Sequence, residues 1–413
     1  MTVTASKIPA LRFPEFEGEW EEKKLGVCAI KIGSGSTPKG GESVYQKVGI
    51  PFIRSQNINN DRLDLSRVTF ISEEINAQMS GTIVQPLDLL LNITGASIGR
   101  SCVVPKFFEG GNVNQHVCIV RLKKNYSPFF IQAKLSSFAG QKAIIRNQVG
   151  GSREGLNFQS VRLLKFDLPS FLEQQKITAF LSTIDTRIHQ FSRKKALLEQ
   201  YKKGVMQQIF SQKIRFKDHD GKAFPAWEYR RLSSVLNEHG LKSKDVEEVY
   251  SVSVHKGVIN QKEHLGRSFA AATTSHYNLV KPHDIIYTKS PTGDFPLGII
   301  KQSRVDRNVI VSPLYGVFTP ETPALGYILN DYFASSINTH NYLQSIIQKG
   351  AKNTINITNK TFLSKSLRLP VSKEEQQKIA AFLSTLDRQI NLVSQQLKRM
   401  QTFKKGLLQQ MFV

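Results

Sequence analysis

The chain has 413 residues and a formal net charge of +23, because 56 Lys and Arg outnumber 33 Asp and Glu. A charge of this size, spread along the whole chain, favours a polyanionic partner, and nucleic acid is the first candidate. The three cysteines form no CxxC pair and no apolar run has signal-peptide or membrane-spanning length, so the sequence argues against zinc, disulfide and membrane classes and predicts a cytoplasmic protein.

Residues 1–168 are predicted to form an entry segment and a first globular body. Short β-branched runs and one longer apolar-periodic run predict three strands and a mostly helical segment, at 50–55, 88–94, 116–122 and 126–146. The Gly-rich stretch 33–41 lacks the lysine-serine end of a phosphate-binding loop. Two interpretations remain for it: a plain turn, or a loop that lays Ser36, Thr37 and Lys39 against DNA.

Residues 169–210 are predicted to form one long helix. Apolar residues recur at alternating steps of four and three and fill eight of ten positions in the series, which is a heptad pattern typical of a coiled coil. Leu168-Pro169 helps to mark the start of the helix. The residues predicted to pair with another helix are Ile177, Leu181, Ile184 and Ile188.

A linker and a second globular body follow at residues 211–369. Its predicted strands and helix lie at 284–289, 298–301, 315–319 and about 325–348. The two bodies have the same coarse α+β pattern, but their sequences diverge. Divergent bodies in a repeated frame suggest that each body recognises something different.

Residues 370–413 repeat the first long helix. Residues 173–210 and 375–412 align without a gap at an offset of 202 and share 19 of 38 positions. Trp20-Glu21 and Trp227-Glu228 form a shorter repeat upstream of the bodies, so the chain contains two copies of one plan. Nine of ten seam positions are apolar, and the predicted pairing residues are Ile379, Leu383, Leu386 and Ile390.

Chain topology favours antiparallel pairing of these helices. Each helix is expected to be about 50 Å long, so parallel pairing would require a nearly fully extended linker after Ser211. The predicted fold class is therefore α+β, with two globular mixed α/β bodies joined by a long antiparallel two-helix coiled coil and related by an internal pseudo-twofold repeat. Such symmetry would match duplex DNA, with the helices as a spacer. Alternatively, the helices merely hold two domains together.

A search for catalytic motifs finds none. The sequence has no Asn/Asp-Pro-Pro-aromatic motif and no GxxxxGK[ST] loop, and its nine histidines show no HExxH spacing. Neighbouring carboxylates such as Glu73 and Glu74 point apart on a helix or strand. We therefore expect no catalytic residue, metal site or cofactor in this chain.

Polar, planar and basic side chains in predicted loops are candidates for base contacts. Arg suits guanine, and Asn and Gln suit adenine, through bidentate hydrogen bonds. The candidate DNA-binding residues are Ser36, Thr37, Lys39, Arg54, Gln56, Asn57, Arg100, Ser152, Arg153, His255, Lys256, Lys289, Ser290, Thr292, Arg304, Lys349, Lys352 and Asn353. Each of them alone is more often a surface or turn residue than a base contact.

The repeated motifs resemble those of the DNA-specificity subunit of type I restriction-modification systems. They comprise EQQKI and FLSTxD in both long helices, the KKGxxQQxF endings, the RFP entry with WExKKL, and the GSTPK loop. Gly150-Gly151-Ser152-Arg153 also resembles the stretch that ends a target-recognition domain in that family. The second copy departs from it with Gly350-Ala351-Lys352-Asn353, so an equivalence of Lys352 with Arg153 is not established.

The resemblance implies two target-recognition domains that each bind one half of a split double-stranded DNA target. It also implies that the helices dock two methyltransferase subunits and that restriction (motor-nuclease) subunits join for cleavage. S-adenosylmethionine, ATP and Mg would then belong to those partner subunits. The alternative is a coiled-coil scaffold protein with non-specific nucleic-acid affinity, and the target sequence itself does not follow from the motifs.

Overall fold

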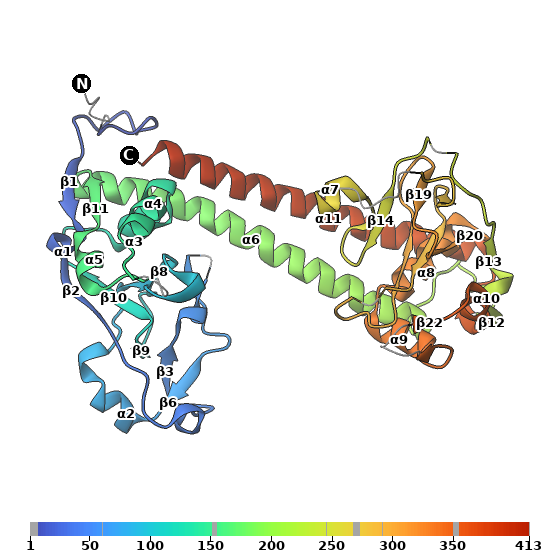
Figure 1. The fold of residues 1–413 in the computed structure, drawn as a ribbon, viewed down its shortest axis with the longest axis horizontal. Coiled ribbons are helices and arrows are strands. Elements are labelled where there is room, and N and C mark those ends of the chain that lie inside the picture. Colours follow the sequence, from blue (N-terminus) through green and yellow to red (C-terminus); the bar gives the residue numbers. More distant parts are fainter. Residues whose placement is uncertain are drawn as a thin grey trace. The chain divides into compact units, whose positions relative to one another are not determined.

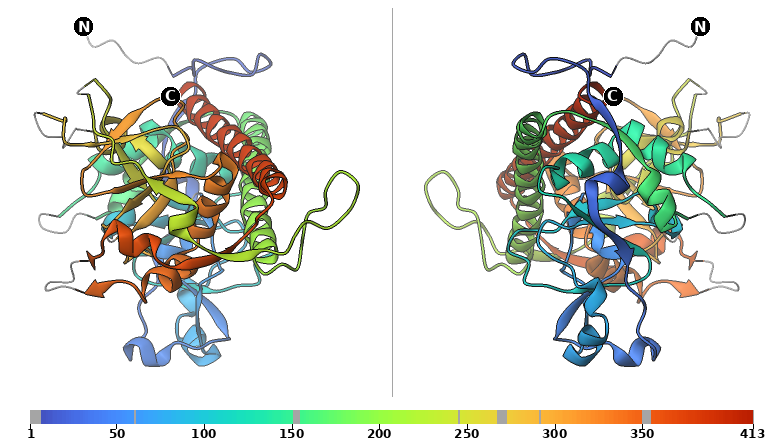
Figure 2. Two further views of the ribbon diagram at one scale, coloured as in Figure 1. Left: turned by 90° about the vertical axis from the view of Figure 1, so that its right-hand side faces the viewer. Right: turned by 90° about the vertical axis from the view of Figure 1, so that its left-hand side faces the viewer.

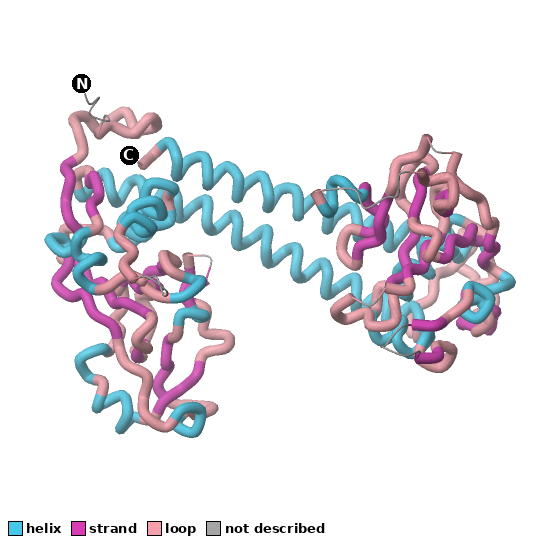
Figure 3. Tube along the Cα trace, in the orientation of Figure 1, coloured by secondary structure: helices cyan, strands magenta, loops and turns pink. Residues whose placement is uncertain are grey.

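The structure is a computed structural model that describes residues 7–59, 61–150, 155–244, 246–266, 273–290, 292–349 and 355–412. The chain divides into two compact units: unit 1 is Met1–Ser192 with Ser394–Val413, and unit 2 is Arg193–Val393. Strands, loops and short helices form a body in each unit, and two long helices, α6 (Phe171–Phe210) and α11 (Lys373–Gln410), each contribute one part to both units (Figure 3).

The body of unit 1, in which Figure 1 labels β2, β8 and β10, contains a four-stranded antiparallel sheet in the order β2-β10-β7-β8. A three-stranded sheet, β6-β3-β9, and the pairs β1-β11 and β4-β5 complete it. The strands are β1 (Glu21–Lys24), β2 (Ala29–Ser34), β3 (Ile50–Ile53), β4 (Ile58–Asn59), β5 (Arg62–Leu63), β6 (Thr69–Ile71), β7 (Leu89–Asn92), β8 (Ser101–Val103), β9 (Asn112–Val113), β10 (Val117–Leu122) and β11 (Lys165–Leu168). The helices are α1 (Leu25–Cys28), α2 (Glu73–Gln78), α3 (Pro128–Ser136), α4 (Phe138–Arg146) and α5 (Phe158–Leu163). The strands predicted near 50–55, 88–94 and 116–122 are confirmed as β3, β7 and β10.

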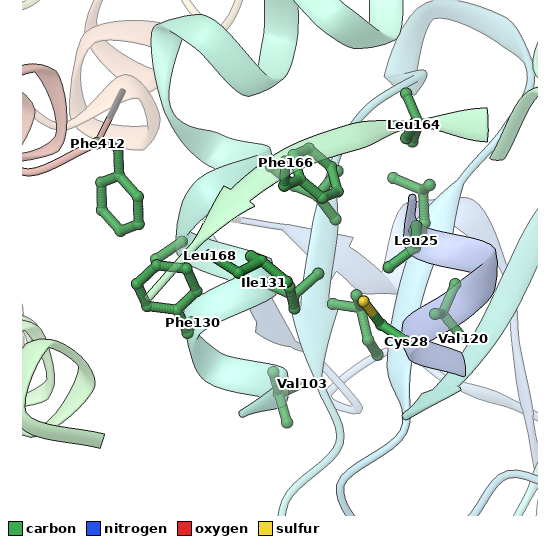
Figure 4. Packing of buried hydrophobic residues seen from close by; sticks show 14 of the residues in the cluster. Leu25, Cys28, Val103, Val120, Phe130, Ile131, Leu164, Phe166, Leu168 and Phe412 are labelled. Carbon is green, nitrogen blue, oxygen red and sulfur yellow. The ribbon is translucent and has the colours of Figure 1, made fainter. Parts of the chain in front are cut away.

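The main sheet of unit 1 is buried on both faces because consecutive residues of its strands are apolar and their side chains point to opposite faces. Leu89 and Leu91 join the core beneath α3 and the long helices, whereas Leu90 belongs to a second core on the opposite face. Figure 4 shows the first core, in which Phe130 of α3 lies beside Phe412 from the end of the chain. The body and the helix pair of unit 1 therefore share one hydrophobic core.

The body of unit 2 repeats this plan, with a four-stranded antiparallel sheet in the order β13-β20-β17-β18. Its strands are β12 (Glu228–Arg231), β13 (Leu236–Glu238), β14 (Tyr250–Ser253), β15 (Gly257–Asn260), β16 (Asn278–Val280), β17 (Ile285–Thr288), β18 (Ile299–Gln302), β19 (Val309–Val311), β20 (Gly316–Pro320), β21 (Gln348–Lys349), β22 (Ile355–Asn356) and β23 (Ser366–Leu369). Its helices are α7 (Gln261–Leu265), α8 (Pro323–Phe333), α9 (Ser336–Leu343) and α10 (Asn359–Leu363). In both sheets the first strand along the chain pairs with the last, so two divergent sequences share one topology, and the predicted fold class is confirmed.

The helix predicted at the end of each body is interrupted, which the periodicity did not indicate. Ser137 ends α3 and caps α4, because its hydroxyl accepts a hydrogen bond from the Gly140 amide at 3.1 Å. Ser335 separates α8 from α9 in the same way, accepting from Asn338 N at 3.3 Å. A serine that bonds the backbone offers an N-cap geometry that competes with continuation of the helix.

The two long helices pair in antiparallel fashion, as predicted. In unit 1 the start of α6 packs on the end of α11, since Ile177 shares a core with Met411. In unit 2 the end of α6 packs on the start of α11, where Ile209 lies in one core with Ile379. Figures 1 and 2 show the two helices side by side. The eight residues predicted to pair are all buried or half-buried.

Candidate functional site

The entry segment of each body is clamped to the start of a long helix. In unit 1 the Arg12 guanidinium donates two hydrogen bonds of 2.8 Å to Glu173, whose side chain is 1% exposed, and Trp20 donates to the same carboxylate at 3.3 Å. The charge-assisted hydrogen bonds that Arg12 donates to Glu173 raise the pKa of Arg12. In unit 2 Arg215 lies 3.4 Å from Glu375, also 1% exposed. Arg12 and Arg215, each with the glutamate at the start of a long helix, thus have a structural role.

The glutamine that follows each of these glutamates ties the helix to its body. Gln174 accepts a hydrogen bond from the backbone N–H of Ser127, the N-cap of α3, at 3.0 Å. Gln376 accepts from the hydroxyl of Thr322, the N-cap of α8, at 2.6 Å. Both amides also donate to a proline carbonyl just before their own helix. The EQQ motif therefore positions the last helical part of each body.

A lysine at a seam position forms a three-way contact in each unit. In unit 2 Lys202 Nζ lies 2.7 Å from Asp387 of α11 and 2.8 Å from Asp331 of α8. Burial raises the pKa of Asp331 despite Lys202. Burial also acts to raise the pKa of Asp387, but hydrogen bonds from Lys202 and Tyr327 outweigh it and the pKa is lowered.

The equivalent contact in unit 1 joins the same helical positions. Lys404 Nζ lies 2.8 Å from Asp185 of α6 and 3.2 Å from Asp61, which is in the turn between β4 and β5. Burial acts to lower the pKa of Lys404, but the two carboxylates raise it overall. Two of the three seam positions that are not apolar, Lys202 and Lys404, therefore carry ion pairs that join helix, helix and body.

A second group of repeated residues makes no such contact and points to solvent. We define the outer patch of unit 1 as Gln175, Ala179, Thr183, Lys405, Gln409 and Gln410. The outer patch of unit 2 is Gln377, Ala381, Thr385, Lys203, Gln207 and Gln208. All twelve residues are exposed, and each is identical to its counterpart in the other copy. In contrast, every position between Thr186 and Tyr201 that is exposed in both copies differs between them.

The loops of the first body join into a polar network that sequence reasoning found only in part. Thr37, a predicted DNA contact in the Gly-rich loop after β2, donates a hydrogen bond to the side-chain oxygen of Gln115. Gln115 Nε2 lies 3.2 Å from His116 Nε2, and His116 Nδ1 lies 2.5 Å from the hydroxyl of Thr94. Thr94 in turn bridges to Gly155. No sequence motif singles out Gln115, His116 or Thr94 as candidate site residues.

The corresponding turn of the second body has different chemistry. Gln115 and His116 lie between β9 and β10, and the equivalent turn between β19 and β20 contains Leu314 and Tyr315. Leu314 is 75% exposed. Two sheets of the same topology thus present a planar amide at one turn and an apolar side chain at the other.

Short antiparallel pairings close a loop near the end of each body. Val149 and Gly155 exchange backbone hydrogen bonds of 2.8 and 3.1 Å, and β21 pairs with β22 at the equivalent place in unit 2. The predicted contacts Ser152, Arg153, Lys352 and Asn353, and the side chain of Lys349, lie between or beside these pairings but outside the described residues.

The predicted DNA contacts of the first body differ in how exposed they are and in whether their polar groups already form hydrogen bonds within the protein. Asn57 is 2% exposed, and its amide accepts from Arg54 N at 2.9 Å and donates to Asp64 O at 3.0 Å. Its prediction as a base contact is corrected: the amide is consumed in holding its own turn. Arg54 is half-buried, donating to Thr69 at 2.6 Å, whereas Gln56 and Arg100 are exposed, as are Ser36, Thr37 and Lys39.

In the second body, predicted contacts meet at a surface pocket of about 430 Å³ lined by His255, Ser290, Thr292 and Tyr315, among others. Lys256 is exposed nearby in sequence, and burial lowers the pKa of the half-buried Lys289, with Glu238 opposing. Arg304 is exposed and stays a prediction as a DNA contact. Its guanidinium also lies 4.5 Å from the centre of the Tyr327 ring and 3.2 Å from Asp387 of α11, so it contacts the long helix of unit 2 as well.

Within the described residues, no group of three or more His, Cys, Asp or Glu side chains could hold a metal ion. No described helix combines the length and the apolar character needed to cross a membrane.

Residues 17–200 and 227–401 match the family described as the type I restriction modification DNA specificity domain. The type I restriction enzyme EcoBI specificity subunit of Escherichia coli is 34% identical over 134 residues, which cover 32% of this chain and 27% of that protein. A putative type I restriction enzyme MjaX specificity subunit of Methanocaldococcus jannaschii is 24% identical over 209 residues, covering 48% of this chain and 47% of that protein. The matches thus span less than half the length of these curated relatives.

Two solved structures have the same fold. The crystal structure of a type I restriction-modification system S subunit from M. genitalium superposes with a TM-score of 0.61 at 13% identity, over 98% of this chain and 99% of that chain. A chain from a study of complex assembly and conformational transition of the type I R-M system gives a TM-score of 0.53 at 14% identity, over 95% and 97% of the two chains. At these identities the likeness concerns the fold.

Proposed function

This chain belongs to the family of type I restriction-modification DNA specificity subunits, and from that premise we propose that it is the DNA-reading subunit of a type I restriction-modification complex. Each body binds one half of a split double-stranded target. The chain itself performs no chemical step, and methylation and cleavage take place in partner subunits that hold S-adenosylmethionine, ATP and Mg.

One observation supports the proposal of two half-sites. The two bodies share a sheet order and the same contacts with the long helices, but the residues of their exposed loops differ. The EQQ ties and the seam lysines recur in both units at equivalent helical positions. Turns on equivalent sheets differ, with Gln115 in one and Leu314 in the other. A shared frame with different loops supports two DNA-binding surfaces of different sequence preference, and the net charge of +23 suits phosphate contacts on both.

The outer patches support the docking of two copies of one partner, which we propose to be methyltransferase subunits. Solvent-facing helix positions are free to diverge unless a partner contacts them, and the middle of both long helices has diverged. Among the described positions of the two long helices, only the outer patches of unit 1 and unit 2 have residues that are identical and exposed in both copies. Identical surfaces accept identical partners, so one methyltransferase subunit would dock on each patch, and a restriction subunit would join the assembled complex.

The experiment that tests this function is selection of DNA by the assembled complex. Random duplexes are bound, recovered and sequenced at two or more salt concentrations, and methylated adenines are mapped in genomic DNA from cells that carry the complex. We expect one split motif with a fixed gap, and a steep loss of affinity as salt rises. Binding without any sequence preference would instead identify a scaffold with general nucleic-acid affinity, and the proposed function would fail.

A further inference from the structure

The turn between β9 and β10 fixes the side-chain amide of Gln115 at the surface of the first body. The backbone of this turn is itself restrained, because Asn114 Oδ1 accepts a hydrogen bond from His116 N at 3.1 Å and Asn114 O accepts from Val117 N at 3.3 Å. Asn114 is 6% exposed, whereas Gln115 is exposed. An exposed glutamine normally samples many rotamers, so a restrained one is unusual.

Two neighbours determine which way the amide faces. Thr37 donates its hydroxyl proton to Gln115 Oε1, so the oxygen occupies the side toward the Gly-rich loop. Gln115 Nε2 approaches His116 Nε2 at 3.2 Å, and His116 Nδ1 approaches Thr94 Oγ1 at 2.5 Å. The consistent assignment is a neutral His116 that accepts from the amide at Nε2 and donates to Thr94 from Nδ1.

This arrangement leaves a defined pair of hydrogen-bonding groups facing solvent. A primary amide has two N–H donors and two acceptor lone pairs, and the network uses one of each. One N–H and one lone pair remain for a partner, and a primary amide can present one such pair on a single edge. In the major groove adenine presents an N6 donor beside the N7 acceptor, which this edge complements, whereas guanine presents two acceptors and would leave the amide oxygen facing O6.

We propose that Gln115 reads an adenine in the half-site bound by the first body, with Thr37 and His116 as positioning residues that hold its amide. The inference rests on the proposed function, since it requires that the first body contact base edges. Residues that are fixed by their neighbours before binding lose little conformational freedom when the base docks. The equivalent turn of the second body presents Leu314 instead, so its half-site is not read by an amide at this place.

The test is selection from a duplex library by the assembled complex, with the base preference measured at every position of both half-sites. The wild-type complex should select adenine at one position of the first half-site that Gln115→Ala relaxes. At that position the preference for adenine should fall about tenfold or more. Gln115→Glu keeps the shape of the side chain but cannot donate to N7, so it should transfer preference to cytosine, whose N4 group is a donor. Thr37→Val should weaken adenine selection at the same position only.

Gln78→Ala, which alters an exposed glutamine on α2 of the same body, is the matched control and should change no preference. The proposal is overturned if folded Gln115→Ala and Gln115→Glu complexes keep every base preference. It is overturned equally if Gln115→Ala weakens binding to all sequences alike and leaves every base preference unchanged, which would indicate a contact with the DNA backbone. A wild-type complex without any split motif would instead refute the proposed function, so the two failures are distinguishable.

Discussion

Lys202→Met is expected to destabilise unit 2 far more than Lys404→Met destabilises unit 1. The two lysines hold equivalent seam positions, but their carboxylate partners differ in burial. The exposed side-chain fractions of those partners are 2% for Asp331, 20% for Asp387, 34% for Asp61 and 39% for Asp185. Removing one member of a buried ion pair costs about 3–5 kcal/mol. A partly exposed carboxylate regains water, so the loss in unit 1 should be about 1 kcal/mol.

The penalty of Lys202→Met should also depend on pH. Burial places the folded-state pKa of Asp331 above its ordinary value, and the Lys202 charge opposes that rise. Without the lysine the folded-state pKa rises further. A raised folded-state pKa means that the protonated form favours folding and that this contribution is lost as pH increases through it. The free-energy difference between variant and wild type should therefore widen toward pH 8 and shrink toward pH 5.

Urea unfolding of the full chain measures both effects. The protein has two tryptophans, Trp20 in unit 1 and Trp227 in unit 2, so a Trp20→Phe background lets fluorescence follow unit 2 alone. Lys203→Met, at the exposed neighbouring position, should change stability by less than about 0.5 kcal/mol. The reasoning fails if Lys404→Met costs as much as Lys202→Met, or if the Lys202→Met penalty is equal at pH 5 and pH 8.

Three further changes test the frame and its surfaces. Replacing Leu383 and Leu386, 0% and 6% exposed, with Asp should cost several kcal/mol and unpair the helices; unchanged circular dichroism and partner capture would show that the seam is assigned wrongly. Ala179→Glu should remove one partner subunit per complex, seen as lost mass by native mass spectrometry, whereas Ala196→Glu on the divergent middle of α6 should remove none. Exchanging residues 22–165 for those of another family member should change one half of the target in a methylation map, and retention of the old half would contradict the domain assignment.

The long helices and the main strands followed from sequence because each depends on a local period. The seam from Ile177 onward needs only a heptad, and β7 needs only a short apolar run. The helix breaks at Ser137 and Ser335 were missed because a single capping serine interrupts an apolar pattern without altering it. The fixed amide of Gln115 could not be predicted, since only the sheet topology brings Thr37 to Gln115 and Thr94 to the neighbouring His116.

Asn57 failed as a predicted contact for a related reason. Its residue type suits both a base contact and a turn that bonds its own backbone, and the sequence offers no way to choose. The structure uses the amide within the turn, where it holds Arg54 and Asp64. Polar residues in loops therefore predict DNA binding poorly until their local hydrogen bonds are known. Apolar seam residues predict helix pairing well, because their periodic spacing is itself the signal.

The two bodies supply the carboxylate beside each seam lysine from different residues. This explains how the sequences of the bodies can diverge while the paired long helices stay the same. Asp331 is the ninth residue of α8 and contacts Lys202 directly, at 2.8 Å. The ninth residue of α3 is Ser136, which donates at 2.7 Å to Asp61, and Asp61 contacts the second lysine. The frame thus requires a carboxylate beside each lysine but does not fix which residue supplies it.

This interpretation predicts a rescue within unit 1. Asp61→Asn should destabilise the unit by about 1 kcal/mol, since the lysine loses one of two partly exposed partners. Adding Ser136→Asp should restore most of that loss by copying the arrangement of unit 2. Trp20 fluorescence in a Trp227→Phe background measures unfolding of unit 1 alone. If the double variant is no more stable than Asp61→Asn, a carboxylate beside the seam lysine is not what the long helices require of a body. The fit between body and helices would then depend on the hydrogen bond from Ser127 to Gln174 and on the ion pair of Arg12 with Glu173.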